Sequence, residues 1–131
     1  LVGGKSMGGR IAAMLTGGPL DARVVGLVCL GYPLHPPGKP DALRLGPLEG
    51  TRLPTLVCQG ERDEFGNRAT FETLPVPKRV QIAWITDGNH DFGPRGASGA
   101  TLSTNLAAAA DAVAAFGQSI IDPATPDDLS S

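Results

Sequence analysis

The chain begins with a short apolar stretch that runs directly into a glycine-rich turn, Val2-Gly3-Gly4-Lys5-Ser6-Met7-Gly8-Gly9. Gly4, Ser6 and Gly8 form a Gly-x-Ser-x-Gly pattern, and a helix-like stretch at residues 10–15 follows at once. This order predicts a strand that turns sharply into a helix at a serine with a strained backbone. Small residues two before and two after the serine are needed because the strand and the helix nearly touch. We therefore interpret Gly4 and Gly8 as the turn glycines.

A serine in such a turn projects its hydroxyl above the edge of the sheet, where the helix N-terminus stabilises developing negative charge. These are the features of a nucleophile elbow, so the first interpretation of Ser6 is a reactive serine. Two other interpretations stay open at this point. Gly4-Lys5-Ser6 also ends a P-loop, whose first glycine would stand five residues before Gly4 and hence before residue 1. Alternatively, Ser6 only caps the helix.

Composition narrows the class of protein. The 131 residues suit one domain with a modest core, and the net charge of −2 is dispersed without a basic run, so no nucleic-acid partner is expected. No apolar stretch approaches the roughly 18 residues of a membrane span, so no membrane partner is expected either. Cys29 and Cys58 each lie inside an apolar run. This favours buried free thiols of a reducing compartment, and a cytoplasmic location, over a disulfide or a metal pair.

Apolar runs separated by glycine and proline indicate alternating strands and helices. The continuous β-branched run at residues 24–30 predicts a strand buried on both faces, as in a parallel sheet. Further strands are expected at residues 55–59 and 80–85. A short turn of helix is expected near residues 41–45, and longer helices at 67–74, with Asn67 as the cap, and at 101–121. The order predicts the α/β class, with a parallel sheet of three to four strands flanked by helices.

The domain organisation is expected to be simple. Residues 1–121 are interpreted as the C-terminal part of one domain, and residues 122–131, which are polar and contain proline, as a flexible tail. Because the chain opens with leucine and reaches its most strained feature within a few residues, we expect N-terminal strands of the sheet to precede residue 1. The stretch 32–54 is rich in proline and glycine and is expected to form a lid or a wall facing the substrate.

Three chemically suited side chains follow three predicted strands. In a parallel α/β sheet, catalytic residues gather at the carboxyl ends of the strands, and those ends carry Ser6, Asp63 and His90. A serine becomes a nucleophile when an imidazole takes its proton and a carboxylate orients that imidazole. The chain order Ser, Asp, His is that of α/β-hydrolases. Glu61 and Glu64 are rival acids, but the spacing from the preceding glycine favours Asp63.

Together these segments resemble the C-terminal half of a small α/β-hydrolase of the dienelactone-hydrolase-like kind. The chain is more similar still to bacterial proteins related to the hydrolase-like domain of a chromatin-complex subunit. The resemblance spans residues 1 to about 94 and is carried by four ordered segments, 3–10, 29–40, 59–66 and 88–92. It implies Ser6 as nucleophile, Asp63 as acid and His90 as base. It also implies the Met7 backbone N–H as one oxyanion donor and a second donor on a loop before residue 1.

The resulting expectation is a serine hydrolase that cleaves an ester or related acyl bond of a small-molecule substrate through an acyl-enzyme, without a cofactor or metal. The alternative is a catalytically idle binding or scaffold protein with the same fold, because the resemblance includes a subunit of a regulatory complex. The 131 residues alone are expected to be inactive, since an absent oxyanion donor costs roughly 10²–10³-fold in rate.

A two-metal phosphoesterase is the remote alternative. Gly60-Glu61-Arg62-Asp63 and Gly88-Asn89-His90-Asp91 resemble two motifs of such enzymes, which hold their cations with several histidines and aspartates. No histidine follows His90, and the other histidine, His35, lies in the proline-rich stretch, where we expect it near the mouth of the pocket. The P-loop interpretation also weakens, because neither later strand ends in an acid placed to hold magnesium. Lys5 is expected to face solvent or a neighbouring loop.

Overall fold

The computed structural model describes residues 1–122, so the predicted tail lies outside the described residues except for Asp122. The elements of the chain run in the order β1 (Val2–Lys5), α1 (Met7–Leu15), β2 (Leu27–Leu30), α2 (Gly46–Gly50), β3 (Thr55–Gly60), α3 (Arg68–Glu72), β4 (Val80–Ile85), a 3-10 turn η1 (Gly96–Ser98) and α4 (Leu102–Ile121). The four strands form one sheet in the order β1-β2-β3-β4, and every neighbouring pair is parallel. The predicted α/β class with a parallel sheet is confirmed.

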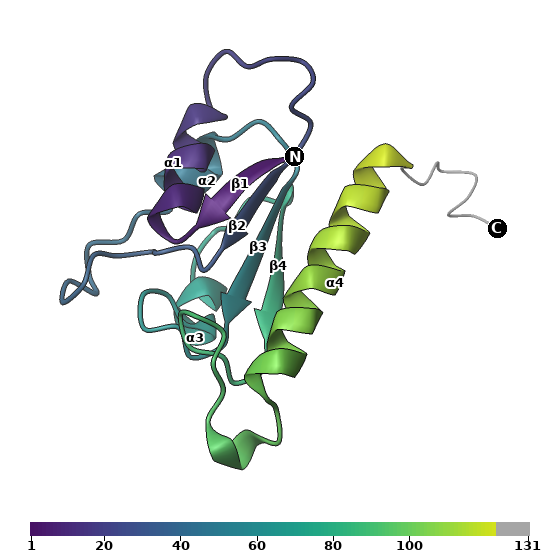
Figure 1. Cartoon of the computed structure of the whole chain (residues 1–131). Helices are drawn as coiled ribbons and strands as arrows, with labels where there is room; N and C mark the ends of the chain where they lie inside the picture. The colour runs from purple at the N-terminus through teal and green to yellow at the C-terminus, as the bar shows by residue number, and fades with distance from the viewer. Residues whose placement is uncertain (123–131) are drawn as a thin grey trace.

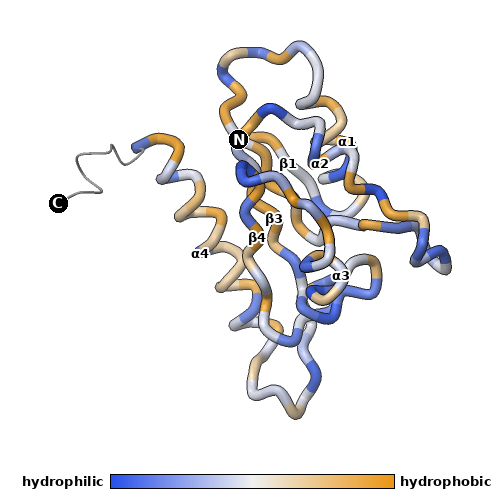
Figure 2. The backbone as a smooth tube through the Cα atoms, turned by 180° about the vertical axis from the view of Figure 1, so that it is seen from behind, coloured by the Kyte–Doolittle hydropathy of each residue, from blue (hydrophilic) through white to orange (hydrophobic). Residues whose placement is uncertain are grey.

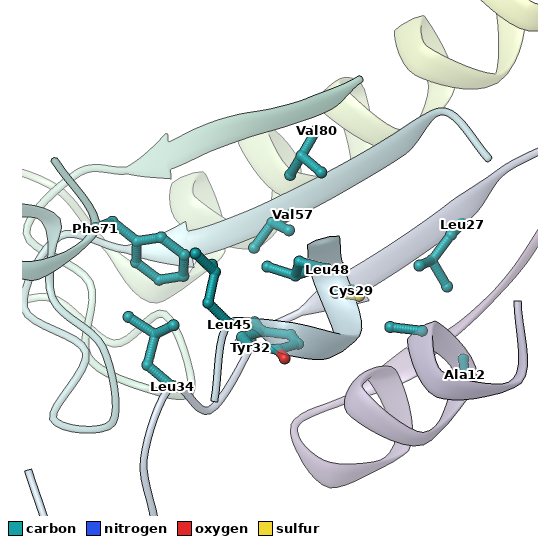
Figure 3. Close-up of a cluster of buried hydrophobic side chains, with 11 residues drawn as sticks. Ala12, Leu27, Cys29, Tyr32, Leu34, Leu45, Leu48, Val57, Phe71 and Val80 are labelled. Atoms are coloured by element: carbon teal, nitrogen blue, oxygen red, sulfur yellow. The ribbon is translucent and has the colours of Figure 1, made fainter. Parts of the chain in front are cut away.

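Helices cover both faces of the sheet, as is usual for parallel strands (Figure 1). On one face, α1, α2 and α3 bury a cluster of hydrophobic side chains around Leu27, Cys29 and Val57 (Figure 3). On the other face, α4 packs on a second cluster that includes Val28 and Leu56. Neighbouring residues of one strand thus point to opposite faces, as expected for β-structure. Figure 2 shows β3 as largely hydrophobic and the turns beyond its carboxyl end, beside α3, as largely hydrophilic.

Two predicted elements are misplaced. The strand expected at residues 24–30 is reduced to β2. The neighbouring strands pair with it only from Leu27 onward, where Leu27 lies opposite Val2 of β1 and Thr55 of β3. The short helix expected at 41–45 lies instead at α2. Pro47 explains this position, since proline fits the first turn of a helix, where no backbone N–H is needed.

The helix starts at residues 67 and 101 agree with the prediction. The Asn67 side chain accepts a hydrogen bond from the Thr70 N–H at 2.9 Å, although α3 ends at Glu72 rather than at residue 74. Thr101 caps α4 through a reciprocal capping box with Thr104, and α4 extends to Ile121 as predicted.

Both cysteines are buried free thiols, as predicted. Burial raises the pKa of Cys29 to about 12 and the pKa of Cys58 to about 11. Both thiols therefore stay protonated near neutral pH, and neither is suited to act as a nucleophile.

The carboxyl ends of the four parallel strands meet at one edge of the sheet (Figure 1). Ser6 follows β1 directly, Asp63 follows β3 within one short turn, and His90 follows β4 in the next turn. The topology therefore brings these three residues to the same edge, where ligands of parallel α/β sheets bind.

Candidate active site

The turn between β1 and α1 holds Ser6 in an unusual backbone conformation. Its φ of 53° and ψ of −121° lie outside the regions that residues with a side chain normally adopt. A hydrogen bond of 2.8 Å from the Ser6 N–H to the Leu30 carbonyl fixes the turn. A Cβ on Gly4 would stand 2.7 Å from the carbonyl carbon of Gly8, so only glycine fits where β1 passes the start of α1. The structure thus has a sharp strand-to-helix turn at the predicted serine.

The second close glycine is not the predicted one. We expected Gly8 to permit the close approach, but beyond its chain neighbours and its own helix backbone a Cβ on Gly8 would meet no atom of the described residues within 4 Å. A Cβ on Gly9 would lie 2.7 Å from the Gly4 carbonyl oxygen and 3.2 Å from the Cys29 Cβ. Gly9 is buried against the sheet and Gly8 is exposed. It is therefore Gly9 whose missing side chain lets α1 pack on β1 and β2.

Asp63 is positioned by the turn that follows β3. A Cβ on Gly60, the last residue of β3, would overlap two carbonyl oxygens of the turn after β4, so glycine lets these two turns touch. Asp63 is only 1% exposed, and its Oδ1 accepts a hydrogen bond of 2.8 Å from the Phe65 N–H. Burial raises the pKa of Asp63, while hydrogen bonds from His90 and Phe65 act in the opposite direction.

His90 joins the other two side chains into one hydrogen-bonded chain. Its Nδ1 lies 2.8 Å from Asp63 Oδ2, and its Nε2 lies 2.8 Å from Ser6 Oγ. Because an ionised carboxylate only accepts hydrogen bonds, Nδ1 carries the proton and Nε2 is free to accept one from Ser6. The Phe65 ring packs edge-on against the imidazole, with 4.8 Å between the ring centroids. The structure therefore brings the three predicted side chains together.

The two rival glutamates are engaged elsewhere. Glu61 accepts a hydrogen bond of 2.8 Å from the Asp87 N–H and pairs with Arg68 at 3.1 Å. Glu64 is exposed, and its carboxylate lies 3.4 Å from the backbone nitrogen of His90. Of the three acids considered, Asp63 is the one that contacts the imidazole ring.

The side-chain amides of Asn105 and Asn89 anchor the turn that carries His90. The Asn105 side chain, 3% exposed on α4, donates hydrogen bonds to the carbonyls of Thr86 and Phe92 at 2.9 and 2.8 Å. Inside the turn, the Asn89 side-chain oxygen accepts two hydrogen bonds of 2.9 Å from backbone N–H groups that follow His90. The imidazole is thus held by a turn whose backbone groups are paired at both ends.

An ion-pair cluster fixes the start of the same turn. Asp87 has a φ of 52°, and its carboxylate pairs with Arg62 at 3.0 Å and with Arg95 at 2.6 Å. The hydrogen bonds from Arg95, helped by the charge of Arg62, lower the pKa of Asp87 to about 2. Asp87 therefore stays ionised throughout the pH range in which a histidine base works.

Replacing Asp87 with asparagine is expected to flatten the acid side of the stability–pH curve. The pKa of Asp87 lies below its unfolded value, so its stabilisation is complete above about pH 4 and disappears as the pH falls towards its folded value of about 2. Asparagine tolerates the positive φ but has no charge to lose. Urea unfolding of the full-length protein should show a difference from wild type that shrinks below about pH 4. Asp111→Asn, exposed on α4, is the matched control, and a pH-independent difference for the Asp87 variant would contradict the prediction.

Lys5 and His35 lie at the rim of the site. Lys5 Nζ pairs with Asp91 Oδ1 at 2.6 Å, so the lysine faces the neighbouring histidine turn, as expected. The hydrogen bond from Lys5 lowers the pKa of Asp91. His35 is half-buried, and its ring lies 6.1 Å from the Phe65 ring that contacts His90. His35 therefore lies one aromatic ring away from the His90 imidazole.

Met7 places a backbone donor directly after Ser6. It is the first residue of α1, so its N–H belongs to the group of first-turn donors that have no acceptor within the helix. The N-terminal end of the helix also carries the positive end of the helix dipole. This arrangement can stabilise a negatively charged oxygen bound next to the Ser6 hydroxyl.

Three residues that support the site were not predicted from the sequence: Gln59, Phe65 and Asn105. Gln59 is fully buried, and its Nε2 donates towards Asp63 Oδ2 at 3.2 Å. A signal for it existed, because a glutamine stands in β3, which is buried at every position. Phe65 and Asn105 had no such signal, since their partners are distant in sequence and no local spacing connects them.

The acids of the phosphoesterase-like motifs do not form a shared centre. Within residues 1–122, no three His, Cys, Asp or Glu side chains lie close enough together to hold a metal ion. Glu61 and Asp91 are paired instead with Arg68 and Lys5.

Among the helices of residues 1–122, none is both long and apolar enough to cross a membrane.

Comparison with known proteins identifies the family. A family model described as an alpha/beta hydrolase domain matches residues 1–118. The structure is also similar to the crystal structure of the esterase domain from a Rhodothermus marinus protein, with a TM-score of 0.53 and 14% sequence identity. That match covers 86% of this chain and 57% of the other, so the chain spans little more than half the length of this relative. Such a low identity shows the shared fold alone. Because the family model covers most of the residues, the chain belongs to the α/β hydrolase family.

Proposed function

We propose that the protein is a serine hydrolase that cleaves an ester or related acyl bond of a small-molecule substrate. The observation that carries this proposal is the hydrogen-bonded chain from Ser6 through His90 to Asp63, in which both links are 2.8 Å. Family membership supports it, and so does the strained turn that presents the serine at the edge of the sheet.

In the acylation step, Ser6 Oγ attacks the carbonyl carbon of the substrate while its proton moves to His90 Nε2. A bond forms between Oγ and carbon, and the carbonyl oxygen becomes an oxyanion that the Met7 N–H stabilises. Asp63 holds the imidazole in the required tautomer and stabilises its positive charge. When the bond to the leaving group breaks, His90 gives its proton to the departing oxygen, and an acyl-serine remains.

In the deacylation step, a water molecule repeats the attack on the acyl carbon. His90 Nε2 takes a proton from the water, and the new carbon–oxygen bond forms a second oxyanion at the same place. Collapse of this oxyanion breaks the bond to Ser6 Oγ, which recovers its proton from His90. The products are a carboxylic acid and the free serine.

A second oxyanion donor is needed for full activity, and we propose that it lies outside these 131 residues, because the match to the esterase domain covers only 57% of that chain. One donor of such a pair typically contributes roughly 10²–10³-fold in rate. Activity is therefore to be measured on the full-length protein.

A fluorophosphonate probe tests the proposed function. It is expected to label the full-length protein on the peptide that contains Ser6, as measured by mass spectrometry, because only an activated serine reacts with it. Labelling should disappear in Ser6→Ala and persist in Ser98→Ala, which removes an exposed serine of the turn η1. A wild-type protein that neither reacts with the probe nor hydrolyses any member of a broad ester panel would instead support the idle binding role.

A further inference from the structure

Gln59 is a buried carboxamide at the junction of three parts of the site. It precedes the last residue of β3 and is 0% exposed. Its Oε1 accepts a hydrogen bond of 2.8 Å from the Tyr32 N–H. Its Nε2 lies 3.0 Å from the Tyr32 carbonyl oxygen, 2.9 Å from the Gly66 carbonyl oxygen and 3.2 Å from Asp63 Oδ2. One side chain therefore connects the segment after β2, the end of the acid turn and the acid itself.

These contacts allow one orientation of the carboxamide. The Tyr32 N–H needs an acceptor, so the side-chain oxygen of Gln59 faces it and the NH₂ group faces the three oxygens. A flipped amide would leave the Tyr32 N–H unpaired and would place an oxygen against two carbonyls and a carboxylate. The two N–H hydrogens of Gln59 serve three acceptors, so Asp63 shares a donor with a backbone carbonyl.

Gln59 and His90 converge on the same oxygen of the acid. Asp63 Oδ2 accepts from His90 Nδ1 at 2.8 Å and from Gln59 Nε2 at 3.2 Å, while Oδ1 is held by the Phe65 N–H at 2.8 Å. The two donors on Oδ2 and the one on Oδ1 fix the plane of a carboxylate that is buried away from solvent.

We propose that Gln59 is a positioning residue for the reaction: its carboxamide fixes the Asp63 carboxylate towards His90 and joins the acid turn to the Tyr32 segment. This role rests on the proposed serine hydrolase function. Gln59 does not touch the reacting atoms, and its effect on His90 passes through Asp63.

Removal of this donor is expected to change the acid limb of the pH–rate profile. Asp63 would then carry its buried charge with fewer hydrogen bonds, and its Oδ2 would hold the protonated His90 ring more tightly. The other charged groups near these two residues, Glu64, Asp91 and Lys5, remain unchanged. The pH below which activity is lost should therefore move to a higher value.

Two substitutions separate a hydrogen-bonding role from a packing role. Gln59→Met nearly keeps the volume but removes the donor and the acceptor, and it should lower kcat by about 100-fold and move the acid limb to higher pH. Gln59→Glu keeps the size of the side chain and the acceptor for the Tyr32 N–H. It also replaces the NH₂ group with a second oxygen, which faces two carbonyl oxygens and the Asp63 carboxylate, so it should lower kcat further. If packing alone mattered, the glutamate variant would be no worse than the methionine variant and the limb would stay in place. If Gln59→Glu does not fold, Gln59→Met decides the question.

Thr16→Val is the matched control for the loss of a buried hydrogen bond. Thr16 lies at the C-terminal end of α1, away from the site, and its Oγ1 is 2.6 Å from Thr51 Oγ1. This variant should lower Tm without moving the acid limb. The same shift of the limb in Thr16→Val and Gln59→Met would overturn the role of Gln59, as would a wild-type kcat in Gln59→Met.

An NMR measurement separates this inference from the proposed function. The low-field proton resonance of His90 Nδ1–H reports the hydrogen bond to Asp63 and needs no turnover. We expect it to shift or broaden in Gln59→Met and to stay unchanged in Thr16→Val. A wild-type protein that is not labelled by the fluorophosphonate and hydrolyses no ester would refute the proposed function, whereas an unchanged resonance in Gln59→Met would refute the role of Gln59.

Discussion

Ser6→Ala and His90→Gln are each expected to lower kcat for an ester substrate by about 10⁶-fold, and the double variant by no more than either alone. The reason is that the two side chains act as a unit: without Nε2 the hydroxyl keeps its proton, and without the hydroxyl the imidazole has no proton to take. At about 1.4 kcal/mol per tenfold change, each loss corresponds to about 8 kcal/mol of transition-state stabilisation. The measurement is the steady-state rate of the purified full-length protein with a chromogenic ester.

The controls for this pair use the same residue types outside the hydrogen-bonded chain. Ser98→Ala should keep wild-type kcat, because Ser98 bonds only to the Arg95 carbonyl and the Ala100 N–H among the described residues. His35→Gln should change kcat by less than about tenfold, since His35 contacts the Phe65 ring rather than the serine. A Ser6→Ala variant that keeps more than about 1% of the activity would place the nucleophile elsewhere.

The three residues of the hydrogen-bonded chain could be predicted because their signals are local. Each follows a strand and a glycine, and a parallel sheet brings the ends of its strands to one edge, whatever the intervening loops do. The choice of Asp63 over Glu61 depended on its spacing from Gly60. In the structure, Glu61 is turned towards Arg68 and Asp87.

The features that were missed or misplaced depend on partners that the sequence does not place. Which of Gly8 and Gly9 faces β1 depends on the rotation of α1, which the packing of the helix on the sheet determines. The start of β2 is determined by where its neighbours begin, so the apolar character of residues 24–26 was a poor guide to the length of the strand. The contacts of Gln59 with Tyr32 and Asp63 link three segments, and only the buried glutamine itself hinted at them.

Asp63→Asn is the most specific test of how the imidazole is held. The introduced asparagine can still accept the Phe65 N–H through its oxygen, but its NH₂ group would then face His90 Nδ1, which carries a proton in the wild type. To avoid two facing donors, the imidazole must move its proton to Nε2. In that tautomer Nε2 donates to Ser6 Oγ and cannot accept the serine proton.

Asp63→Asn is therefore expected to lower kcat by about 10⁴-fold, or about 5.5 kcal/mol, while Glu64→Gln changes it by less than about threefold. The asparagine NH₂ group would also face Gln59 Nε2, which donates towards Oδ2 in the wild type, so Tm is expected to fall as well. Thermal unfolding at pH 7 and the kcat–pH profile of the three full-length proteins check both parts. If Glu64→Gln lost activity while Asp63→Asn kept a near wild-type kcat, the exposed glutamate, rather than the buried aspartate, would orient the imidazole.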